Sequence, residues 1–435
     1  MPAARQTPPA PDLPTSPRPP SADARIAQPL RRLAMVIGMT LSLASPAARA
    51  AETSAADGVG KPAGAPAARP APPKPVPPKP ASTRPDSARP GSTRPPSANT
   101  ARAARPAATA GAAAAGTAAA AQAAPTDDLA RQPAVRDFVK TMVEEHRFDE
   151  DELLAFFGKV RLVPEVLRLI APPPPGFRRS WSGYRGRFVE PLRIRDGLRF
   201  WSAHEAVIAR ASERYGVPAE IIVAIIGVET IYGRVMGEFR VADALTTLAL
   251  RDPRRASYFR DELTEFLLHT RDTRLDPLSV RGSYAGASGI PQFMPASIRR
   301  FAVDFDGDGA IDLRASPADA IGSVGRFLAE HGWRTGEPTH FRARIDDAAR
   351  AQKLIDGGIE PRVRPPQLAE HGLASPDDIA PDMPLALIDL PDGDGPTIYR
   401  LGGPNFYVIT RYNRSNFYAM AVIELAETLR AERRR

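Results

Sequence analysis

The residue best suited to acid–base chemistry is Glu229, which ends the almost uninterrupted apolar run VPAEIIVAIIGVE (217–229). The run predicts a helix with Pro218 in its first turn and Gly233 at its far end. A helix that is apolar on all sides is buried, so the carboxyl group of Glu229 is carried to the edge of a core. Burial raises the pKa of a carboxyl group, as a general acid near neutral pH requires. The alternative is a glutamate that faces solvent in the last turn.

A glycine-rich segment, GSYAGASGIPQFMPASI (282–298), is the second candidate for chemistry. Its glycines let the backbone approach a ligand closely, and its polar side chains are spaced to converge on one point. These side chains are Ser283, Tyr284, Ser288 and Gln292. The alternative is an ordinary structural loop.

The segment DFDGDGAID (304–312) predicts a cation site. Its aspartates stand at the first, third and fifth positions of an EF-hand loop, with Gly309 at the sixth. Position twelve is Ala315 instead of Glu, so we expect Asp319, in the next helix, to replace it. The expected ligands are Asp304, Asp306, Asp308, the carbonyl of Ala310 and Asp319. A structural Ca²⁺ here connects the glycine-rich loop to the following helix; the alternative is an acidic turn without metal.

Aromatic and basic residues offer candidate binding groups. Sugar rings have apolar faces that stack on aromatic side chains in ligand clefts. The candidate aromatic residues are Trp181, Tyr184, Tyr232, Tyr412 and Tyr418, with core packing as the alternative. The neighbouring Arg254 and Arg255 are suited to holding a carboxylate, whereas solvated surface arginines are the default interpretation.

The elements that position these residues are mostly helical. Apolar residues recur at three- and four-residue steps in 135–148, 149–170, 195–216, 241–250, 257–272, 318–333 and 417–435, and a further helix begins near Pro295. Short β-type runs at 385–391, 396–402 and 406–413 are separated by turn residues. The pattern predicts an α+β protein, with a mainly helical body and a small late β subdomain at about 336–412.

The N-terminal third has a different composition. Residues 1–50 read as a disordered leader with a signal sequence at about 25–50, whose apolar stretch 33–44 follows basic residues. An uncleaved anchor is the alternative, although the stretch is short for a membrane span. Residues 51–126 read as a disordered Pro/Ala-rich linker, and residues 127–435 as the catalytic domain.

Charge and cysteine content narrow the function classes. The net charge of +8 comes largely from the linker, so it does not indicate a nucleic-acid partner. The 435 residues include no cysteine, which excludes disulfides, thiolate metal sites and a lipid-acceptor cysteine. We therefore expect an exported, periplasmic protein without a lipid anchor.

The order of several segments along the chain is more informative than any one of these segments alone. They are YRGRFVEP, VPAEIIVAIIGVETIYGRVMG, DPRRASYF, GSYAGASGIPQFMPASI, AVDFDGDG, AIGSVGRFLAEHGW and YVITRYNRSNFYAMAV. Together they resemble the lytic murein transglycosylase B family (glycoside hydrolase family 103, SLT-like), from about residue 137 to residue 425. The resemblance implies a lysozyme-like fold and peptidoglycan strands as the substrate.

The resemblance also implies residue roles. Glu229 falls on the sole catalytic acid/base, and Ser283 on a serine that hydrogen-bonds it. Implied substrate contacts are Ser283, Gln292, Tyr184, Tyr412, Asn413 and Tyr418, with Arg254 and Arg255 facing the stem peptide; the aspartate segment falls on a calcium loop. The chain departs from the family at Gly289-Ile290-Pro291, often Gly-Tyr-Gly, and at Ile231-Tyr232, which both bear on subsite preference.

The predicted function is cleavage of the bond between N-acetylmuramic acid (MurNAc) and N-acetylglucosamine (GlcNAc), with a 1,6-anhydro-muramoyl product and no cofactor for the chemistry. A hydrolytic muramidase and a noncatalytic peptidoglycan-binding protein are the rivals, and a calcium sensor is a third. The sequence leaves the protein partners open, with cell-wall synthesis or division proteins as the candidate class.

Overall fold

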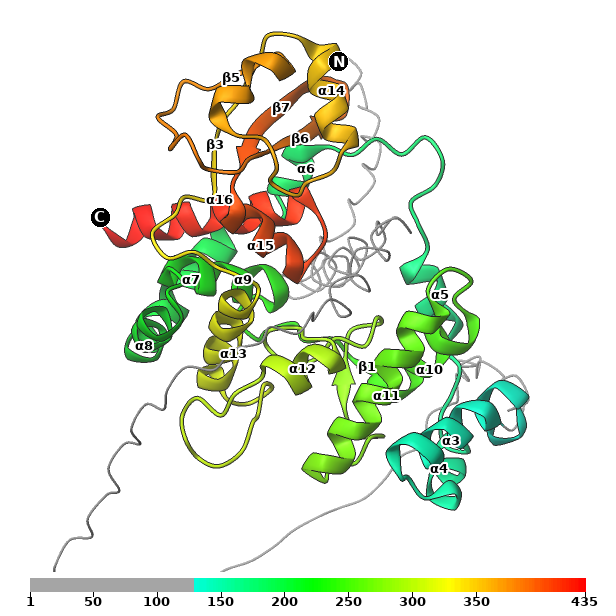
Figure 1. Cartoon of the computed structure of the whole chain (residues 1–435). Helices are drawn as coiled ribbons and strands as arrows, with labels where there is room; N and C mark the ends of the chain where they lie inside the picture. The colour runs from blue at the N-terminus through cyan, green and yellow to red at the C-terminus, as the bar shows by residue number, and fades with distance from the viewer. Residues whose placement is uncertain (1–128) are drawn as a thin grey trace, which may run out of the picture. The chain divides into compact units, whose positions relative to one another are not determined.

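The computed structural model describes residues 129–435 (Figure 1). The helices are η3 (Leu129–Arg131), α3 (Pro133–His146), α4 (Glu150–Phe157), α5 (Pro164–Ile170), α6 (Trp181–Arg185), α7 (Pro191–Ala203), α8 (Glu205–Tyr215), α9 (Ala219–Thr230), α10 (Val241–Arg251), α11 (Ala256–Thr273), α12 (Pro295–Phe301), α13 (Pro317–Glu330), α14 (Ala348–Asp356), η4 (Pro365–Gln367), η5 (Ala369–His371), α15 (Pro404–Tyr412) and α16 (Asn416–Arg433). The strands are β1 (Phe239–Arg240), β2 (Arg281–Gly282), β3 (His340–Arg342), β4 (Arg344–Ile345), β5 (Leu373–Ala374), β6 (Ala386–Asp392) and β7 (Gly395–Gly402). The leader and linker assigned to residues 1–126 lie outside the described residues.

Buried apolar side chains form separate core clusters. The first core is built around α9 and α16, with contributions from α6 to α8, α12, α13, α15 and β6. The second core joins α3 to α5 with α10 and α11. The third core lies between α14 and the sheet of β3, β7 and β6. The glycine-rich segment contributes to both larger cores, because Tyr284 packs in the second and Phe293 in the first.

Helix α9 occupies the first core almost completely. It packs against α7, α8, α13 and α16, and every residue from Ile221 to Thr230 is buried. Pro218 precedes the helix as its N-cap, and the helix ends at Thr230 because Ile231 adopts a left-handed conformation. The end therefore comes three residues before Gly233, the residue that the sequence favoured for it.

The sheet is antiparallel in the order β3-β7-β6. Successive side chains of a strand point to opposite faces. In β6, Ile388 and Leu390 therefore pack in the first core, whereas Leu387 packs in the third. The β subdomain thus shares a strand with the helical body.

Three sequence predictions of secondary structure were wrong in detail. The run 406–413, expected as a strand, forms α15, because Pro404 starts a helix that packs on α16 and this contact overrides the β propensity of the run. The single helix expected over 195–216 is broken at His204 into α7 and α8. The segment 149–170 forms α4 and α5, separated before Pro164.

None of the helices in the described part of the chain combines the length and the apolar character needed to cross a bilayer.

Candidate active site

Glu229 lies in the last turn of α9 and is only 5% exposed. The hydroxyl of Tyr418, from the first turn of α16, donates a hydrogen bond of 2.7 Å to its Oε1. Burial raises the pKa of Glu229 to about 8, and the Tyr418 hydrogen bond opposes this rise only in part. The carboxyl group is therefore mostly protonated at neutral pH, which confirms the expectation of a buried, perturbed glutamate.

Tyrosine side chains surround this carboxyl group. Tyr418 is buried, and Tyr412 stacks on it with ring centroids 6.3 Å apart. Burial, followed by the charge of Glu229, raises the pKa values of Tyr184, Tyr412 and Tyr418 well above the usual value for a phenol. These phenols stay neutral over the working pH range, so they can donate hydrogen bonds without competing for the proton of Glu229.

Two hydrogen bonds connect this group to the glycine-rich loop. The Thr230 hydroxyl donates to the Ile290 carbonyl at 2.8 Å, and the Tyr412 hydroxyl donates to the Pro291 carbonyl at 2.6 Å. The loop between β2 and α12 is thereby held against the end of α9 and the end of α15. The structure thus brings together Glu229, the tyrosines and the loop that the sequence placed far apart.

Ser283 lies at the beginning of this loop. Its hydroxyl accepts a hydrogen bond of 3.1 Å from the Ala287 amide, while its own amide donates to the Ala287 carbonyl at 2.7 Å. Within residues 129–435 no hydrogen bond joins Ser283 to Glu229, as the resemblance implied, and Tyr418 is the donor to Glu229 instead. The Ser283 hydroxyl stabilises a tight turn in this structure.

Gln292 supports the other end of the loop. It is a non-glycine residue in the left-handed region, with φ of 52°. Its side-chain amide donates to the carbonyls of Gly289 at 2.9 Å and Met236 at 3.2 Å. These two hydrogen bonds hold a strained backbone in place, as is common where loops carry function.

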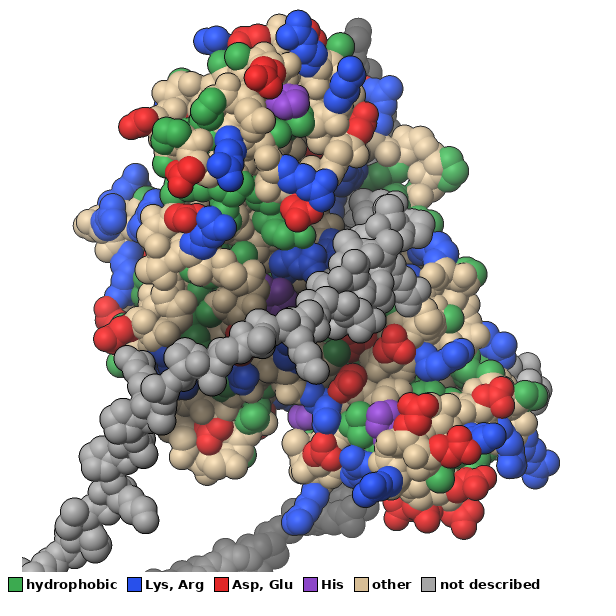
Figure 2. All heavy atoms as spheres, viewed as in Figure 1, with side chains coloured by type: hydrophobic (Ala, Val, Ile, Leu, Met, Phe, Trp, Pro, Cys, Tyr) green, Lys and Arg blue, Asp and Glu red, His purple; other side chains and the backbone are tan. Residues whose placement is uncertain are grey.

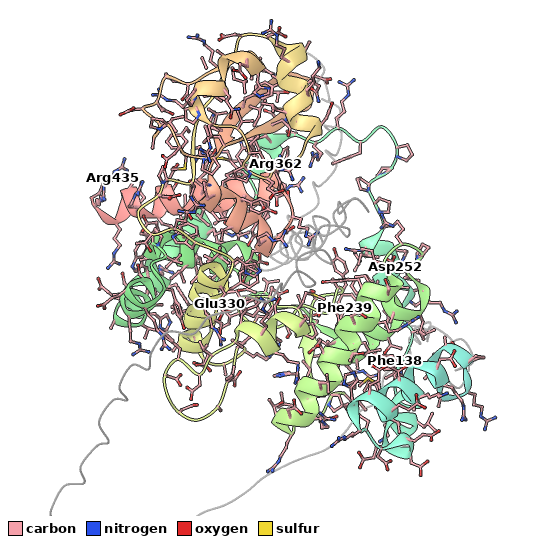
Figure 3. All side chains as sticks on the ribbon, in the orientation of Figure 1. Phe138, Phe239, Asp252, Glu330, Arg362 and Arg435 are labelled. Atoms are coloured by element: carbon pink, nitrogen blue, oxygen red, sulfur yellow. The ribbon has the colours of Figure 1, made fainter. Side chains whose placement is uncertain are left out.

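Arg254 and Arg255 lie in the turn between α10 and α11. Asp252, labelled in Figure 3, accepts hydrogen bonds of 2.8 Å from both of their backbone amides. Arg254 is exposed, and the half-buried Arg255 guanidinium lies 5.0 Å from the centre of the Phe259 ring. Arg255 therefore packs on Phe259 of the second core, whereas Glu229 lies in α9, which forms part of the first.

The remaining aromatic candidates differ in their surroundings. Trp181 is buried and stacks on Tyr184 with centroids 6.4 Å apart. Tyr232 packs against the first core, with its hydroxyl oxygen buried. Asn413 is buried directly after α15, beside Tyr412. Trp181, Tyr184 and Tyr418 thus belong to the first core, and Tyr232 and Tyr412 pack against it, as the alternative interpretation of the aromatic set proposed.

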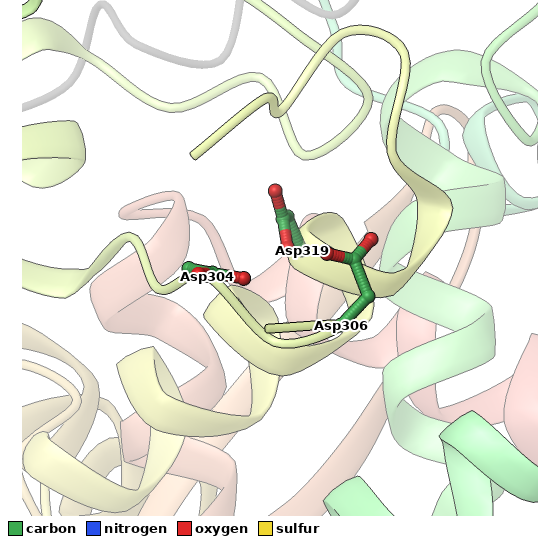
Figure 4. A group of neighbouring side chains, drawn as sticks. All are labelled: Asp304, Asp306 and Asp319. Carbon is green, nitrogen blue, oxygen red and sulfur yellow. The ribbon is translucent and has the colours of Figure 1, made fainter. Parts of the chain in front are cut away.

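Two carboxylates of the aspartate segment and one in the first turn of α13 come together (Figure 4). Asp304, Asp306 and Asp319 each offer an oxygen within 4.8 Å of the others. Gly309 has φ of 92°, which explains the glycine at this position of the loop. Three hard oxygen donors at this spacing fit Ca²⁺. Asp308 and Ala310, the other predicted ligands, are exposed on the same loop, and the ligand role of the Asp308 carboxylate and the Ala310 carbonyl stays a prediction.

Surface charge does not form one basic face in the visible view. Lys and Arg side chains lie beside Asp and Glu side chains over the visible described surface (Figure 2).

Sequence reasoning missed Thr230 and Arg193. Thr230 connects α9 to the glycine-rich loop, and Arg193 is a fully buried cation that donates to the Gly227 carbonyl at 2.7 Å. The position of Thr230 next to Glu229 was an available signal. Nothing in the pattern of 195–216 or its surroundings marks Arg193 as buried, since surface helices commonly carry arginines.

A family model described as "Transglycosylase SLT domain" matches residues 130–427. The chain belongs to this family. It is 43% identical over 310 residues to membrane-bound lytic murein transglycosylase B of Escherichia coli (strain K12), an alignment that covers 69% of this chain and 84% of that protein.

Solved structures of relatives agree with this family assignment. Soluble lytic transglycosylase SltB1 from Pseudomonas aeruginosa is 45% identical, with a TM-score of 0.64, over 70% of this chain and 100% of that chain. The Escherichia coli lytic transglycosylase Slt35 in complex with calcium is 42% identical, with a TM-score of 0.63, over 71% and 96%. SltB3 from Pseudomonas aeruginosa, in complex with NAG-anhNAM-pentapeptide, is 30% identical, with a TM-score of 0.58, over 68% and 78%. These likenesses confirm the predicted lysozyme-like α+β fold.

Proposed function

We propose that this chain is a lytic murein transglycosylase that cleaves the β-1,4 bond between MurNAc and GlcNAc in peptidoglycan, with Glu229 as its acid and base. The observation that carries the proposal is the buried position of Glu229, where its pKa rises to about 8. A carboxyl group that keeps its proton at neutral pH is suited to general acid catalysis. The family and the names of the relatives support the substrate class.

The reaction begins with proton transfer from Glu229 to the glycosidic oxygen. The bond between this oxygen and C1 of MurNAc breaks, and the acetamido oxygen of the same sugar stabilises the positive charge at C1. The Glu229 carboxylate then takes the proton of the C6 hydroxyl, whose oxygen bonds to C1 and closes the 1,6-anhydro ring. Glu229 ends in its initial protonation state, and water is not consumed.

A single carboxylate distinguishes this scheme from most glycosidases, which use two. The raised pKa of Glu229 arises from burial and is opposed by Tyr418, and no second carboxylate among the described residues contributes to it. This supports a substrate-assisted route. The Tyr418 hydroxyl, 2.7 Å from Oε1, stabilises the carboxylate after it has given up its proton.

The other site residues are assigned to the substrate. We place Ser283, Gln292, Tyr184, Tyr412, Asn413 and Tyr418 along the glycan strand, and Arg254 and Arg255 at the stem peptide. The hydrogen bonds from Thr230 and Tyr412 to the loop carbonyls support a common site for most of this set.

Mass spectrometry of sacculi digested with the purified protein tests the reaction. We expect products that end in 1,6-anhydro-MurNAc. Products that end in reducing MurNAc would instead assign a hydrolytic muramidase, and binding to sacculi without any soluble product would assign a noncatalytic peptidoglycan-binding protein.

We further propose that Asp304, Asp306 and Asp319 hold a structural Ca²⁺, with Asp308 and the Ala310 carbonyl completing the shell. Chelation by EDTA then lowers Tm and added Ca²⁺ restores it, because a ligand at 100 times its Kd stabilises the folded state by about 2.7 kcal/mol. In Asp306→Ala the melting temperature no longer responds to Ca²⁺. A large change in the far-ultraviolet circular dichroism on chelation would instead indicate a sensor.

The periplasm is the compartment in which this activity meets its substrate. The signal sequence assigned to about residues 25–50 supports export, and sequencing the N-terminus of the exported protein tests it. An intact leader on the exported protein would contradict cleavage.

A further inference from the structure

The backbone directly after Glu229 and Thr230 is strained. Ile231 and Tyr232 have φ values of 51° and 57°, and Gly233 follows with 85°. The left-handed conformation is unfavourable for a residue other than glycine, because its Cβ atom comes too close to the following carbonyl oxygen. Two such residues in succession at the end of the helix that carries Glu229 persist only if the surrounding packing holds them there.

The side chain of Tyr232 supplies one part of that packing. It lies between α7 and α9 at positions where both helices carry glycine. A Cβ atom at Gly197 would lie 2.3 Å from the Tyr232 hydroxyl oxygen, and one at Gly227 would lie 2.4 Å from it. The ring also packs against Phe200, with centroids 5.3 Å apart. Tyr232 therefore occupies a slot that exists only because two side chains are missing.

The hydroxyl group of Tyr232 does not explain this position. Its oxygen is buried and has no hydrogen-bond partner among the described residues. A tyrosine held for its hydroxyl would be expected to satisfy it, since buried polar groups are normally hydrogen-bonded. The aromatic ring, filling the slot by shape, is the part that fixes the backbone.

Arg193, from α7, supplies the second part. It is completely buried, and its Nε donates to the Gly227 carbonyl at 2.7 Å. The same carbonyl accepts the Ile231 amide at 3.2 Å, the hydrogen bond that ends α9. A positive charge near the C-terminus of a helix also interacts favourably with the helix dipole. Arg193 thus holds the carbonyl located two residues before Glu229.

We propose that Arg193 and Tyr232 are positioning residues that fix the last turn of α9, and with it the carboxyl group of Glu229. This inference rests on the proposed function. When the turn is held, Glu229 stays buried in contact with Tyr418; when it is loose, water reaches the carboxyl group and the reacting atoms lose their alignment. A displacement of about 1 Å can lower turnover on the order of 10²-fold.

Two substitutions of Tyr232 distinguish the effect of its aromatic ring from that of its hydroxyl group. Tyr232→Phe keeps the ring and retains most of the turnover. Tyr232→Ala empties the slot, and we expect turnover on sacculi to fall on the order of 10²-fold with little change in KM. The high-pH limb of its activity profile moves to lower pH, because a more hydrated Glu229 has a lower pKa. If Tyr232 only stabilises the fold, Tyr232→Ala lowers Tm but does not move the high-pH limb.

A second route acts on the slot from the opposite helix. Gly197→Ala places a methyl group against the Tyr232 hydroxyl, and we expect the same loss of turnover and the same shift of the limb. The double variant Gly197→Ala/Tyr232→Phe removes the 2.3 Å contact but keeps contacts of 2.8 Å to Leu429 and 2.9 Å to the ring, so we expect its turnover to stay low. Gly158→Ala is the matched control, since its nearest contact is an ordinary 3.5 Å.

The variants are compared with wild type only after circular dichroism shows that they are folded. Wild-type turnover and an unshifted high-pH limb in both Tyr232→Ala and Gly197→Ala would overturn the inference. An inactive Glu229→Gln alongside these results means that only the inference has failed. An active Glu229→Gln means that the proposed function has failed.

Discussion

Glu229 and Glu262 are both buried glutamates, each 5% exposed and each paired with a tyrosine. Burial raises the pKa of both. Their other partners differ. Glu262, in α11, also accepts the Ala296 amide at 3.0 Å, in the first turn of α12. Glu229 has only the Tyr418 hydroxyl as a side-chain hydrogen-bond donor among the described residues.

This difference in hydrogen-bond donors indicates that the two buried carboxyl groups have different roles. A backbone amide at the start of a helix is a fixed donor that stabilises an acceptor permanently, so Glu262 joins α11 to α12. A carboxyl group in contact with hydroxyl groups alone has no such fixed partner and can exchange its proton with a substrate. Equal burial therefore accompanies a structural role for Glu262 and, in the function that we propose, a proton-transfer role for Glu229.

The largest expected effect compares the two glutamine variants. Glu229→Gln removes the proton donor, and we expect turnover on sacculi to fall on the order of 10³-fold or more. Glu262→Gln keeps a carbonyl oxygen for the Ala296 amide and retains turnover close to that of wild type. Product release from sacculi measures both. Equal losses in the two variants would remove the distinction between them.

Tyr418→Phe sharpens the comparison through the pH profile. The Tyr418 hydroxyl lowers the pKa of Glu229, so its removal raises that pKa further above 8. We expect the high-pH limb to move to higher pH and turnover to fall roughly 10-fold, because the carboxylate formed during the reaction loses a hydrogen bond. Tyr258→Phe, the matched change at Glu262, leaves the limb at its wild-type position. A limb that moves to lower pH in Tyr418→Phe would be evidence against Glu229 as the acid.

The smallest effect is on stability. The folded pKa of Glu229, about 8, lies above its unfolded value, so the folded state binds the extra proton and this contribution is complete below the unfolded pKa. It is lost as pH rises through about 8. Glu229→Gln has no such loss, so its Tm exceeds that of wild type at pH 9 by a few degrees and matches it near pH 4. Melting curves of both proteins across this range measure the difference, and parallel curves would contradict a raised pKa.

The sequence predicted correctly those features that depend on residues within a single segment. The burial of Glu229 follows from the uninterrupted apolar run before it, and the aspartate spacing places Asp304 and Asp306 in one loop with Asp319 nearby. The run 406–413 was predicted as a strand because its β-branched residues suit both structures, and only its packing on α16 made it helical.

Contacts between segments that lie far apart in the chain could not be predicted from the sequence. Tyr418 lies 189 residues from Glu229 along the chain, and no local pattern shows that its hydroxyl, instead of that of Ser283, reaches the carboxyl group. The structural role of Glu262 depends likewise on Ala296, 34 residues away.

The sequence by itself determined that a glutamate ends a buried helix, that an acidic loop is suited to a cation, and to which family the ordered motifs belong. These properties depend on residue type and local spacing. The tertiary structure alone decided which hydroxyl pairs with Glu229, that Arg193 donates to a carbonyl in the last turn of α9, and that Tyr232 fits against two glycines. Those properties arise when helices distant in sequence pack together, because the partner of a buried group is set by the geometry of packing and not by its neighbours in the chain.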